Sequence, residues 1–239
     1  MQKSTNPDFE DLLNRTPPFA SFPAVQRREV ASLAIRREYR RDEFVTLRGE
    51  RWPYLALVEG GAFEAVKESP EGRVLSVLTV RRGEIFWGLT FFDLQAPMPA
   101  AFRAATPGRL ALWSREDLLP WLKNEGEALW ALCGLLVARM QQASEVLEDL
   151  AFQPVAGRLA KLLLHHYAEA DTVPMVRDLT LDEMASLLGT TREMVCRLLY
   201  RFSDDELIHI TRTEFNLLDR HNLARIAGHV KDAAPPAAP

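Results

Sequence analysis

The chain has 239 residues, of which 26% are charged and 47% hydrophobic, as is typical of a globular protein with one large or two modest domains. Its net charge of −4 argues against a protein that coats nucleic acid indiscriminately, because it creates no overall positive field. No segment approaches the roughly 18 uninterrupted apolar residues of a membrane span, and the N-terminus lacks the apolar core of a secretory signal. The only two cysteines, Cys133 and Cys196, suit a reducing compartment. We therefore expect a cytoplasmic protein without a membrane partner.

Residues 1–40 have a mixed, partly helical pattern. After them the sequence changes to short apolar runs separated by turns. Glycine and proline turns cut these runs at Gly49, Gly60-Gly61, the Pro70–Gly72 turn and Gly83. Several short strands at this spacing predict a compact antiparallel β roll or barrel, within an α+β protein. The predicted strands are Phe44–Leu47, Tyr54–Val58, Ala62–Val66 and Val74–Leu78.

A long helix is predicted after Pro120. Asn124 could cap it, with Glu127 reaching back three residues later. Its apolar positions then alternate in steps of four and three, a 3.5-residue repeat. An amphipathic helix lying on the roll would explain the pattern, but the strict alternation favours a helix–helix seam and hence a homodimer. The predicted dimer seam consists of Leu129, Cys133, Leu136, Met140, Ala143, Leu147 and Leu150.

Beyond Pro154, which should end the long helix, the pattern predicts a helix over Val155–Tyr167, a loop over 171–178, and then two short helices. Thr180 and Glu183 have the spacing of a capping box, and Gly189 supplies the positive φ of a tight turn. Thr190 or Thr191 would cap the second helix. Two short helices joined by a glycine turn form a helix-turn-helix. The apolar face of the second helix would be Val195, Leu198, Leu199 and Phe202.

The opposite face of that second helix carries residues that suit DNA. The arginine fork can donate two hydrogen bonds to guanine, and a glutamate can accept one from cytosine. Arg192, Glu193 and Arg197 lie in the half of the helix that would enter the major groove. The same residues also suit simpler roles, because Glu193 could cap the start of the helix and the arginines could be ordinary surface charge.

The same segment resembles the Crp/Fnr family of transcription regulators. The resemblance implies that Arg192, Glu193 and Arg197 read bases in palindromic DNA with TGTGA-like half-sites, and that RNA polymerase is a partner. It also implies that Thr180, Thr191 and Arg201 contact phosphates. Further blocks are similar to the family's hinge (Asp149–Phe152 and Gly157–Ala160), its wing (Leu207-Ile208) and its cyclic-nucleotide-binding roll (83–104). The matching signature residues are Met184-Ala185, Leu188-Gly189, Thr191-Arg192-Glu193, Val195 and Arg197-Leu198.

The sequence departs from this family where a cyclic nucleotide would bind. Trp87-Gly88 replaces the Gly-Glu pair that meets the ribose, and Met98-Pro99 replaces the Arg-Ser/Thr pair that grips the phosphate. Gly83-Glu84 fits better as an earlier turn than as the missing pair. Losing the arginine removes a strong charge-assisted contact, so we expect a degenerate pocket that binds no cyclic nucleotide.

No other cofactor is expected. Two cysteines cannot hold a four-cysteine iron–sulfur cluster, and all five histidines follow the roll, which argues against a haem ligated there. The five tryptophans (52, 87, 113, 121 and 130) could line an apolar effector pocket, but core positions are the more ordinary interpretation.

The leading hypothesis is a non-enzymatic, sequence-specific DNA-binding regulator acting as a homodimer. The alternatives are a cupin-like enzyme with a helical appendage, which would need metal-binding histidines on its strands, and an effector-binding module without DNA recognition. The predicted organisation is a β-roll sensor at 1–120, a dimerisation helix and hinge at 121–153, a winged helix-turn-helix at 154–231, and a disordered tail at 232–239.

Overall fold

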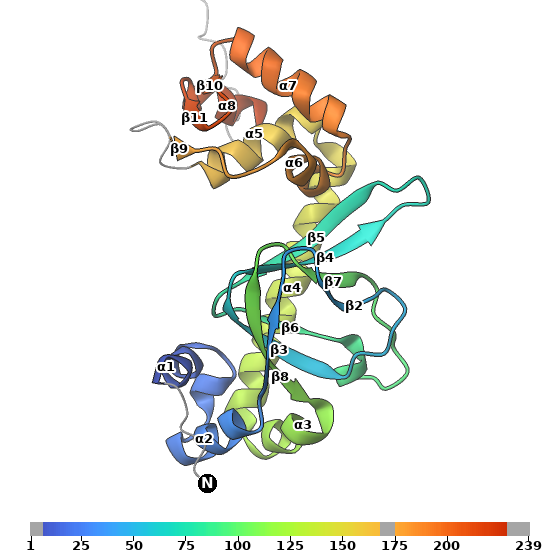
Figure 1. The fold of residues 1–239 in the computed structure, drawn as a ribbon, viewed down its shortest axis with the longest axis vertical. Helices are drawn as coiled ribbons and strands as arrows, with labels where there is room; N and C mark the ends of the chain where they lie inside the picture. Colours follow the sequence, from blue (N-terminus) through green and yellow to red (C-terminus); the bar gives the residue numbers. More distant parts are fainter. Residues whose placement is uncertain (1–6, 168–174, 229–239) are drawn as a thin grey trace, which may run out of the picture. The chain divides into compact units, whose positions relative to one another are not determined.

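The computed structural model describes residues 7–167 and 175–228 (Figure 1), so the tail predicted at 232–239 lies outside the described residues. The chain divides into two compact units. One comprises Met1–Lys67 with Ser76–Ser144, and the other comprises Glu68–Leu75 with Glu145–Pro239. Among the described residues, no helix combines the length and apolar character that crossing a membrane would require.

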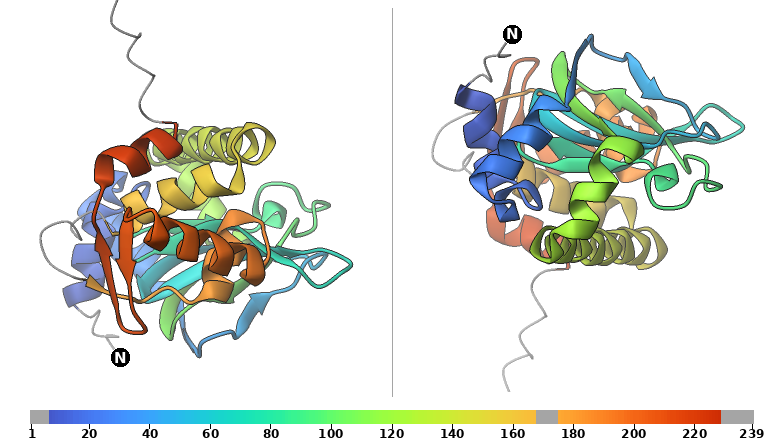
Figure 2. Two further views of the ribbon diagram at one scale, coloured as in Figure 1. Left: turned by 90° about the horizontal axis from the view of Figure 1, so that it is seen from above. Right: turned by 90° about the horizontal axis from the view of Figure 1, so that it is seen from below.

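The first unit is built around two four-stranded sheets, preceded by helices α1 (Pro7–Arg15) and α2 (Ala24–Ser32), which lie side by side (Figure 2). The first sheet has the order β1-β8-β3-β6 and the second β2-β7-β4-β5. The predicted α+β class and antiparallel roll are therefore confirmed. The strands are β1 (Ile35–Tyr39), β2 (Phe44–Thr46), β3 (Tyr54–Gly60), β4 (Ala62–Glu68), β5 (Val74–Arg81), β6 (Ile85–Trp87), β7 (Ala101–Ala104) and β8 (Gly108–Ser114).

Strand β3 is buried on both faces, because successive side chains point to opposite sides of a sheet. Leu55 and Leu57 face a core formed with the N-terminal helices and the helices that follow the roll. Ala56 and Val58 face the interior of the roll. Glu59, only 4% exposed, is paired with Arg36 and Arg109 at the same sheet.

Two helices follow the roll, α3 (Arg115–Asn124) and α4 (Gly126–Phe152). The predicted Asn124 cap is wrong, because Asn124 is the last residue of α3. Ser114 caps α3, which continues through Pro120, and the backbone turns at Glu125, whose φ and ψ are −116° and 94°. The carbonyl of Glu125 accepts from the N–H of Leu129 at 3.1 Å, so α4 begins one residue later than Asn124 would allow. As predicted, α4 ends just before Pro154.

In the described residues of the second unit, four helices follow the last turns of α4, together with a small sheet of order β10-β11-β9. The predicted loop 171–178 is only partly right: 171–174 lie outside the described residues, but Met175 and Val176 form a strand that pairs with β11. That pairing joins segments far apart in sequence, which local patterns do not reveal. The elements are α5 (Val155–His166), β9 (Met175–Val176), α6 (Leu181–Leu188), α7 (Arg192–Asp204), β10 (Ile208–Ile210), β11 (Glu214–Leu217) and α8 (Arg220–Ile226).

Polar side chains tie the helices of the second unit together. The guanidinium of Arg158 on α5 donates to the carbonyls of Gln153, at 2.7 Å, and Leu188, at 2.9 and 3.1 Å. Lys161 forms an ion pair with Asp149 at 2.7 Å. These contacts join the last turns of α4 to α5 and to the end of α6.

A second polar cluster in this unit surrounds Asp178. The carboxylate accepts from the hydroxyl of Tyr167 at 3.1 Å and lies 2.8 Å from Nε2 of His166. Tyr167 is fully buried and its ring stacks on Phe215 of β11, with centroids 4.2 Å apart. Burial, followed by the charge of Asp178, raises the pKa of Tyr167 to about 12. The cluster therefore fixes the segment before α6 against α5.

Candidate nucleic-acid interface

The helix-turn-helix begins with the predicted capping box. The N–H of Glu183 donates to the Thr180 hydroxyl oxygen at 3.2 Å, and the N–H of Thr180 donates to the Glu183 carboxylate at 2.7 Å. Gly189 ends α6 with a φ of 62°, a left-handed conformation that glycine adopts without steric cost. The local sequence thus fixes both ends of the first helix.

Helix α7 is the second helix of this motif. Of the two predicted caps, Thr191 is the one used, accepting from the N–H of Met194 at 3.3 Å. The predicted apolar face is buried in the core of the unit, each side chain being at most 8% exposed: Val195, Leu198, Leu199 and Phe202. Because that face is packed inward, the polar face must point to solvent.

The three predicted base-reading residues are all exposed on α7. Arg192 is held by an ion pair with Asp182 of α6, at 3.2 Å. Arg197 has no ion-pair partner within the part of the chain that the structure describes. A hydrogen bond from its own backbone N–H and one from Thr191 hold the pKa of Glu193 below its ordinary value. Glu193 is therefore favoured as a carboxylate at an exposed position, while the Thr191 hydroxyl caps the helix.

The predicted phosphate contacts are exposed, and each already has a partner in the protein. The Thr180 hydroxyl donates to Glu183 at 2.7 Å, and the Thr191 hydroxyl caps α7. Arg201 forms an ion pair with Asp205 at 3.7 Å. Arg201 is 72% exposed and Asp205 57%, so this pair is weak, on the order of 0–1 kcal/mol, and can rearrange.

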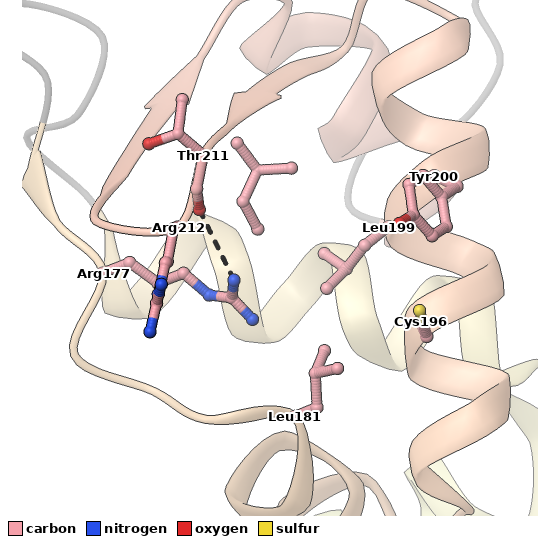
Figure 3. A pocket seen from close by; sticks show the side chains of 8 residues that line it. Arg177, Leu181, Cys196, Leu199, Tyr200, Thr211 and Arg212 are labelled. Carbon is pink, nitrogen blue, oxygen red and sulfur yellow. Dashed lines mark hydrogen bonds between the residues drawn. The ribbon is translucent and has the colours of Figure 1, made fainter.

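The small sheet β10-β11-β9, which we call the wing, carries two arginines that no sequence motif assigns to the site. Arg177 follows β9, and Arg212 lies in the turn between β10 and β11. Together with Cys196 and Tyr200 of α7 they line one cleft (Figure 3). The strand pairing of β9 with β11 brings Arg177 there, and the sequence offered no local signal for it.

The predicted dimer seam is an exposed apolar stripe on α4. Exposed fractions are 73% for Met140 and 68% for Leu147. The residues of α4 that pack on the roll are different ones, chiefly Ala128 and Leu132. The stripe also includes two apolar side chains that the prediction missed, Trp130 at 76% and Val137 at 55% exposure. Trp130 is therefore not a core residue.

The positions predicted to form a degenerate nucleotide pocket lie at a tightly packed part of the roll. A Cβ at Gly88 would lie 1.8 Å from the carbonyl oxygen of Trp52, so the backbone is in close contact there. Met98 is 2% exposed and packs with the aromatic side chains of the roll interior. Among them, the rings of Phe86 and Phe102 stack with centroids 3.8 Å apart. Positions 87, 88, 98 and 99 thus carry an apolar side chain or none, and Met98 among them is buried in the roll interior.

Gly83-Glu84 forms the turn between β5 and β6, as expected. Gly83 has a φ of 86°, and the Glu84 carboxylate accepts from the N–H of Arg81 at 2.7 Å. Within residues 7–167 and 175–228, no group of three or more His, Cys, Asp or Glu side chains is arranged to hold a metal ion.

Two family models match the chain, one over most of the roll and one over the helix-turn-helix. Residues 36–125 match the cyclic nucleotide-binding domain, and residues 157–226 match the Crp-like helix-turn-helix domain. The chain belongs to the Crp/Fnr family.

Curated relatives of this Crp/Fnr chain are transcription regulators. It is 27% identical over 195 residues to the CRP-like cAMP-activated global transcriptional regulator of Mycobacterium tuberculosis, covering 80% of this chain and 87% of the relative. It is 25% identical over 182 residues to Vfr of Pseudomonas aeruginosa, also named a cAMP-activated global regulator, covering 73% and 85%. These relatives agree with the expectation of a regulator rather than an enzyme.

Solved structures show the same fold. A Crp/Fnr family transcriptional regulator from Eubacterium rectale superposes with a TM-score of 0.73 at 18% identity, covering 90% of this chain and 99% of the other. CLP of Xanthomonas campestris, described as a c-di-GMP responsive global regulator, gives 0.69 at 25% identity, covering 80% and 96%. The fold agrees with the Crp-like helix-turn-helix match and the curated relatives, which identify a DNA-binding transcription regulator of this family.

Proposed function

We propose that the protein is a homodimeric regulator that binds palindromic DNA of TGTGA-like half-sites without a cyclic nucleotide. The observation that carries the proposal is the polar face of α7, where Arg192, Glu193 and Arg197 are exposed on a helix whose opposite face is packed. An arginine fork facing a guanine discriminates against the wrong base by about 1–3 kcal/mol. Releasing Arg192 from its exposed ion pair with Asp182 costs less than about 1 kcal/mol. Replacing that ion pair by a contact to guanine therefore favours DNA binding.

The dimer is proposed from the stripe on α4. Six large apolar side chains on it are more than a third exposed in the single chain: Leu129, Trp130, Val137, Met140, Leu147 and Leu150. A contiguous apolar surface of this kind marks an interaction site. Its 3.5-residue repeat suits a second copy of the same helix, since the two would interdigitate along their length. Two recognition helices about 34 Å apart would then enter successive major grooves.

We base the proposed independence from cyclic nucleotides on the interior of the roll, which is apolar. The relatives, by contrast, are named cAMP-activated regulators. A phosphate that enters the roll interior loses hydration and gains no guanidinium, at a cost of several kcal/mol. Control would then come from the amount of protein, or from an apolar ligand among the aromatic side chains of the roll.

The remaining parts of the proposal follow from this role. A transcription regulator works where the chromosome and RNA polymerase are, so we place the protein in the cytoplasm with polymerase as a partner. The proposed divisions are the roll at 1–120, the dimer helix at 121–153 and the DNA-binding domain at 154–231.

In vitro selection from a random DNA library tests the proposal. We expect recovery of a two-fold symmetric site with TGTGA-like halves, bound by a dimer, with no nucleotide added. Recovery of asymmetric or unrelated sequences would contradict the assignment of Arg192, Glu193 and Arg197 as base readers. Enrichment that occurs only when cyclic AMP is present would contradict the nucleotide-independent part.

A further inference from the structure

The two arginines proposed to read bases are held differently. Nη1 of Arg192 donates to the Asp182 carboxylate at 3.2 Å, and this ion pair joins the helices labelled α6 and α7 in Figure 1. Arg197 has no ion-pair partner in the described part of the chain. The difference draws attention to Asp182, which no sequence motif assigns to the site.

Both ends of this ion pair stand on well-fixed backbone. Asp182 lies in the first turn of α6, directly after the cap at Thr180. Arg192 is the first residue of α7, which is capped by Thr191 and packed along its apolar face. Gly189 fixes the turn between the two helices. The ion pair therefore restrains the side chain of Arg192 more than it restrains the helices.

The charges around Arg192 favour an acid beside it. The first turn of a helix carries the positive end of the helix dipole, which disfavours a cation at that position. Arg192 occupies this position in α7, with the Asp182 carboxylate on α6 and that of Glu193 next to it in the chain. A guanidinium flanked by two carboxylates attracts a phosphate less than a solitary guanidinium does.

The ion pair leaves most of the guanidinium open to DNA. A guanidinium has five N–H donors in a fixed planar fork. Asp182 accepts from Nη1, whereas Nε and Nη2 of Arg192 make no hydrogen bond with residues that the structure describes. Those two nitrogens form one edge of the fork, and such an edge matches guanine O6 and N7. Full exchange of the pair for guanine would favour DNA, but Arg192 can also keep Asp182 and meet a base with its other edge.

We infer that Asp182 is a positioning residue, which stays paired with Arg192 on DNA and directs the free edge of the guanidinium to a base. The inference rests on the proposed base reading by Arg192 and deepens it. A restrained guanidinium loses less side-chain freedom when it binds guanine. It is also kept from the phosphates, which every DNA sequence offers alike. Asp182 therefore raises binding to the selected site relative to random DNA.

The test compares Asp182→Ala, Arg192→Ala and the double variant. Asp182→Ala should lower the ratio of affinities for selected and random DNA by about threefold to fivefold, as expected for the coupling of one exposed ion pair. Site selection should show weaker preference at one base pair, the same one that Arg192→Ala affects. The freed Arg192 should bind phosphates of random DNA and steepen the slope of log affinity against log salt by about 1.

The double variant shows whether Asp182 acts through Arg192. In the Arg192→Ala background, Asp182→Ala should change neither the affinity ratio nor the base preference. A loss of ratio of the same size in both backgrounds would mean that Asp182 acts on the helix itself, and would overturn the inference.

Two further variants are controls. Asp204→Ala removes the same charge from an exposed position at the other end of α7, and should leave the ratio and the base preference unchanged. Asp182→Glu keeps a carboxylate and should retain most of the wild-type ratio. Thermal unfolding of the Asp182 variants should match the wild type, because the side chain is 70% exposed.

The outcomes separate this inference from the proposed function. If Arg192→Ala weakens preference at one base pair while Asp182→Ala leaves the ratio unchanged or raises it, base reading stands and the positioning role is overturned. A raised ratio would show that the ion pair opposes base reading. If Arg192→Ala alters preference at no base pair, the proposed base reading by Arg192 fails, and the inference fails with it.

Discussion

Substituting Met140 by glutamate should separate the proposed dimer into monomers. Met140 lies in the middle of the α4 stripe and is 73% exposed in the single chain. Burying a whole methionine side chain contributes roughly 1.5–3 kcal/mol, so covering the exposed part of two copies contributes about 3 kcal/mol. The variant loses this contribution and places two carboxylates in the same seam, where desolvation and repulsion add to the loss.

A loss of about 3 kcal/mol corresponds to roughly a hundredfold increase in the dimer dissociation constant. Sedimentation equilibrium over a range of protein concentrations measures it directly. Gln142→Glu is the matched control: it adds the same charge two residues later, about 200° around the helix from Met140, and should stay dimeric. Circular dichroism should show that both variants keep their helices, since both positions are exposed. A Met140→Glu protein that dimerises as tightly as the wild type would refute the seam.

Three further predictions concern DNA reading, the sensor and pH. Arg197→Ala should weaken binding to the selected site by about 1–3 kcal/mol and reduce the sequence preference at one base pair. Competition assays measure the ratio of affinities for selected and random DNA. An unchanged ratio would rule out base reading by this residue. Calorimetry should detect no binding of cyclic AMP at micromolar concentrations, and DNA shift assays should give the same affinity with and without it. Burial alone would raise the pKa of Asp178, but hydrogen bonds from His166 and Tyr167 and the charge of His166 outweigh it and leave that pKa lowered. A pKa of Asp178 that is lowered on folding stabilises the folded state at pH values above the unfolded pKa, which is near 4. This stabilisation is lost as the pH falls through the pKa of the folded state. The unfolding temperature of Asp178→Asn should therefore lack this acid-dependent decrease.

Local signals in the sequence predicted the parts of the fold that local physics determines. The capping box at Thr180, the left-handed glycine at Gly189 and the apolar face of α7 depend on neighbours within a few residues, and all are confirmed. The turn at Gly83 is confirmed for the same reason. The stripe on α4 was visible because its spacing is a property of one helix.

Features that depend on distant partners were missed. The start of α4 was misplaced at Asn124 because a helix through Pro120 was not expected, although Ser114 caps that helix. Strand β9 exists only because β11 pairs with it, and so the cleft arginine Arg177 had no motif to reveal it. A tryptophan is expected in the core from its residue type alone. Only the packing of α4 shows that Trp130 is exposed.

The contacts of Arg158 show which segments of the second unit are held together across Pro154. Its guanidinium holds the carbonyls of Gln153 and Leu188 together, and Lys161 holds Asp149, so the final turns of α4 cannot turn independently of the helix-turn-helix. Pro154 interrupts the helix but does not act as a free joint. The last turns of α4, from Glu145 on, therefore belong to the same compact unit as the helix-turn-helix, and the break at Pro154 lies inside that unit.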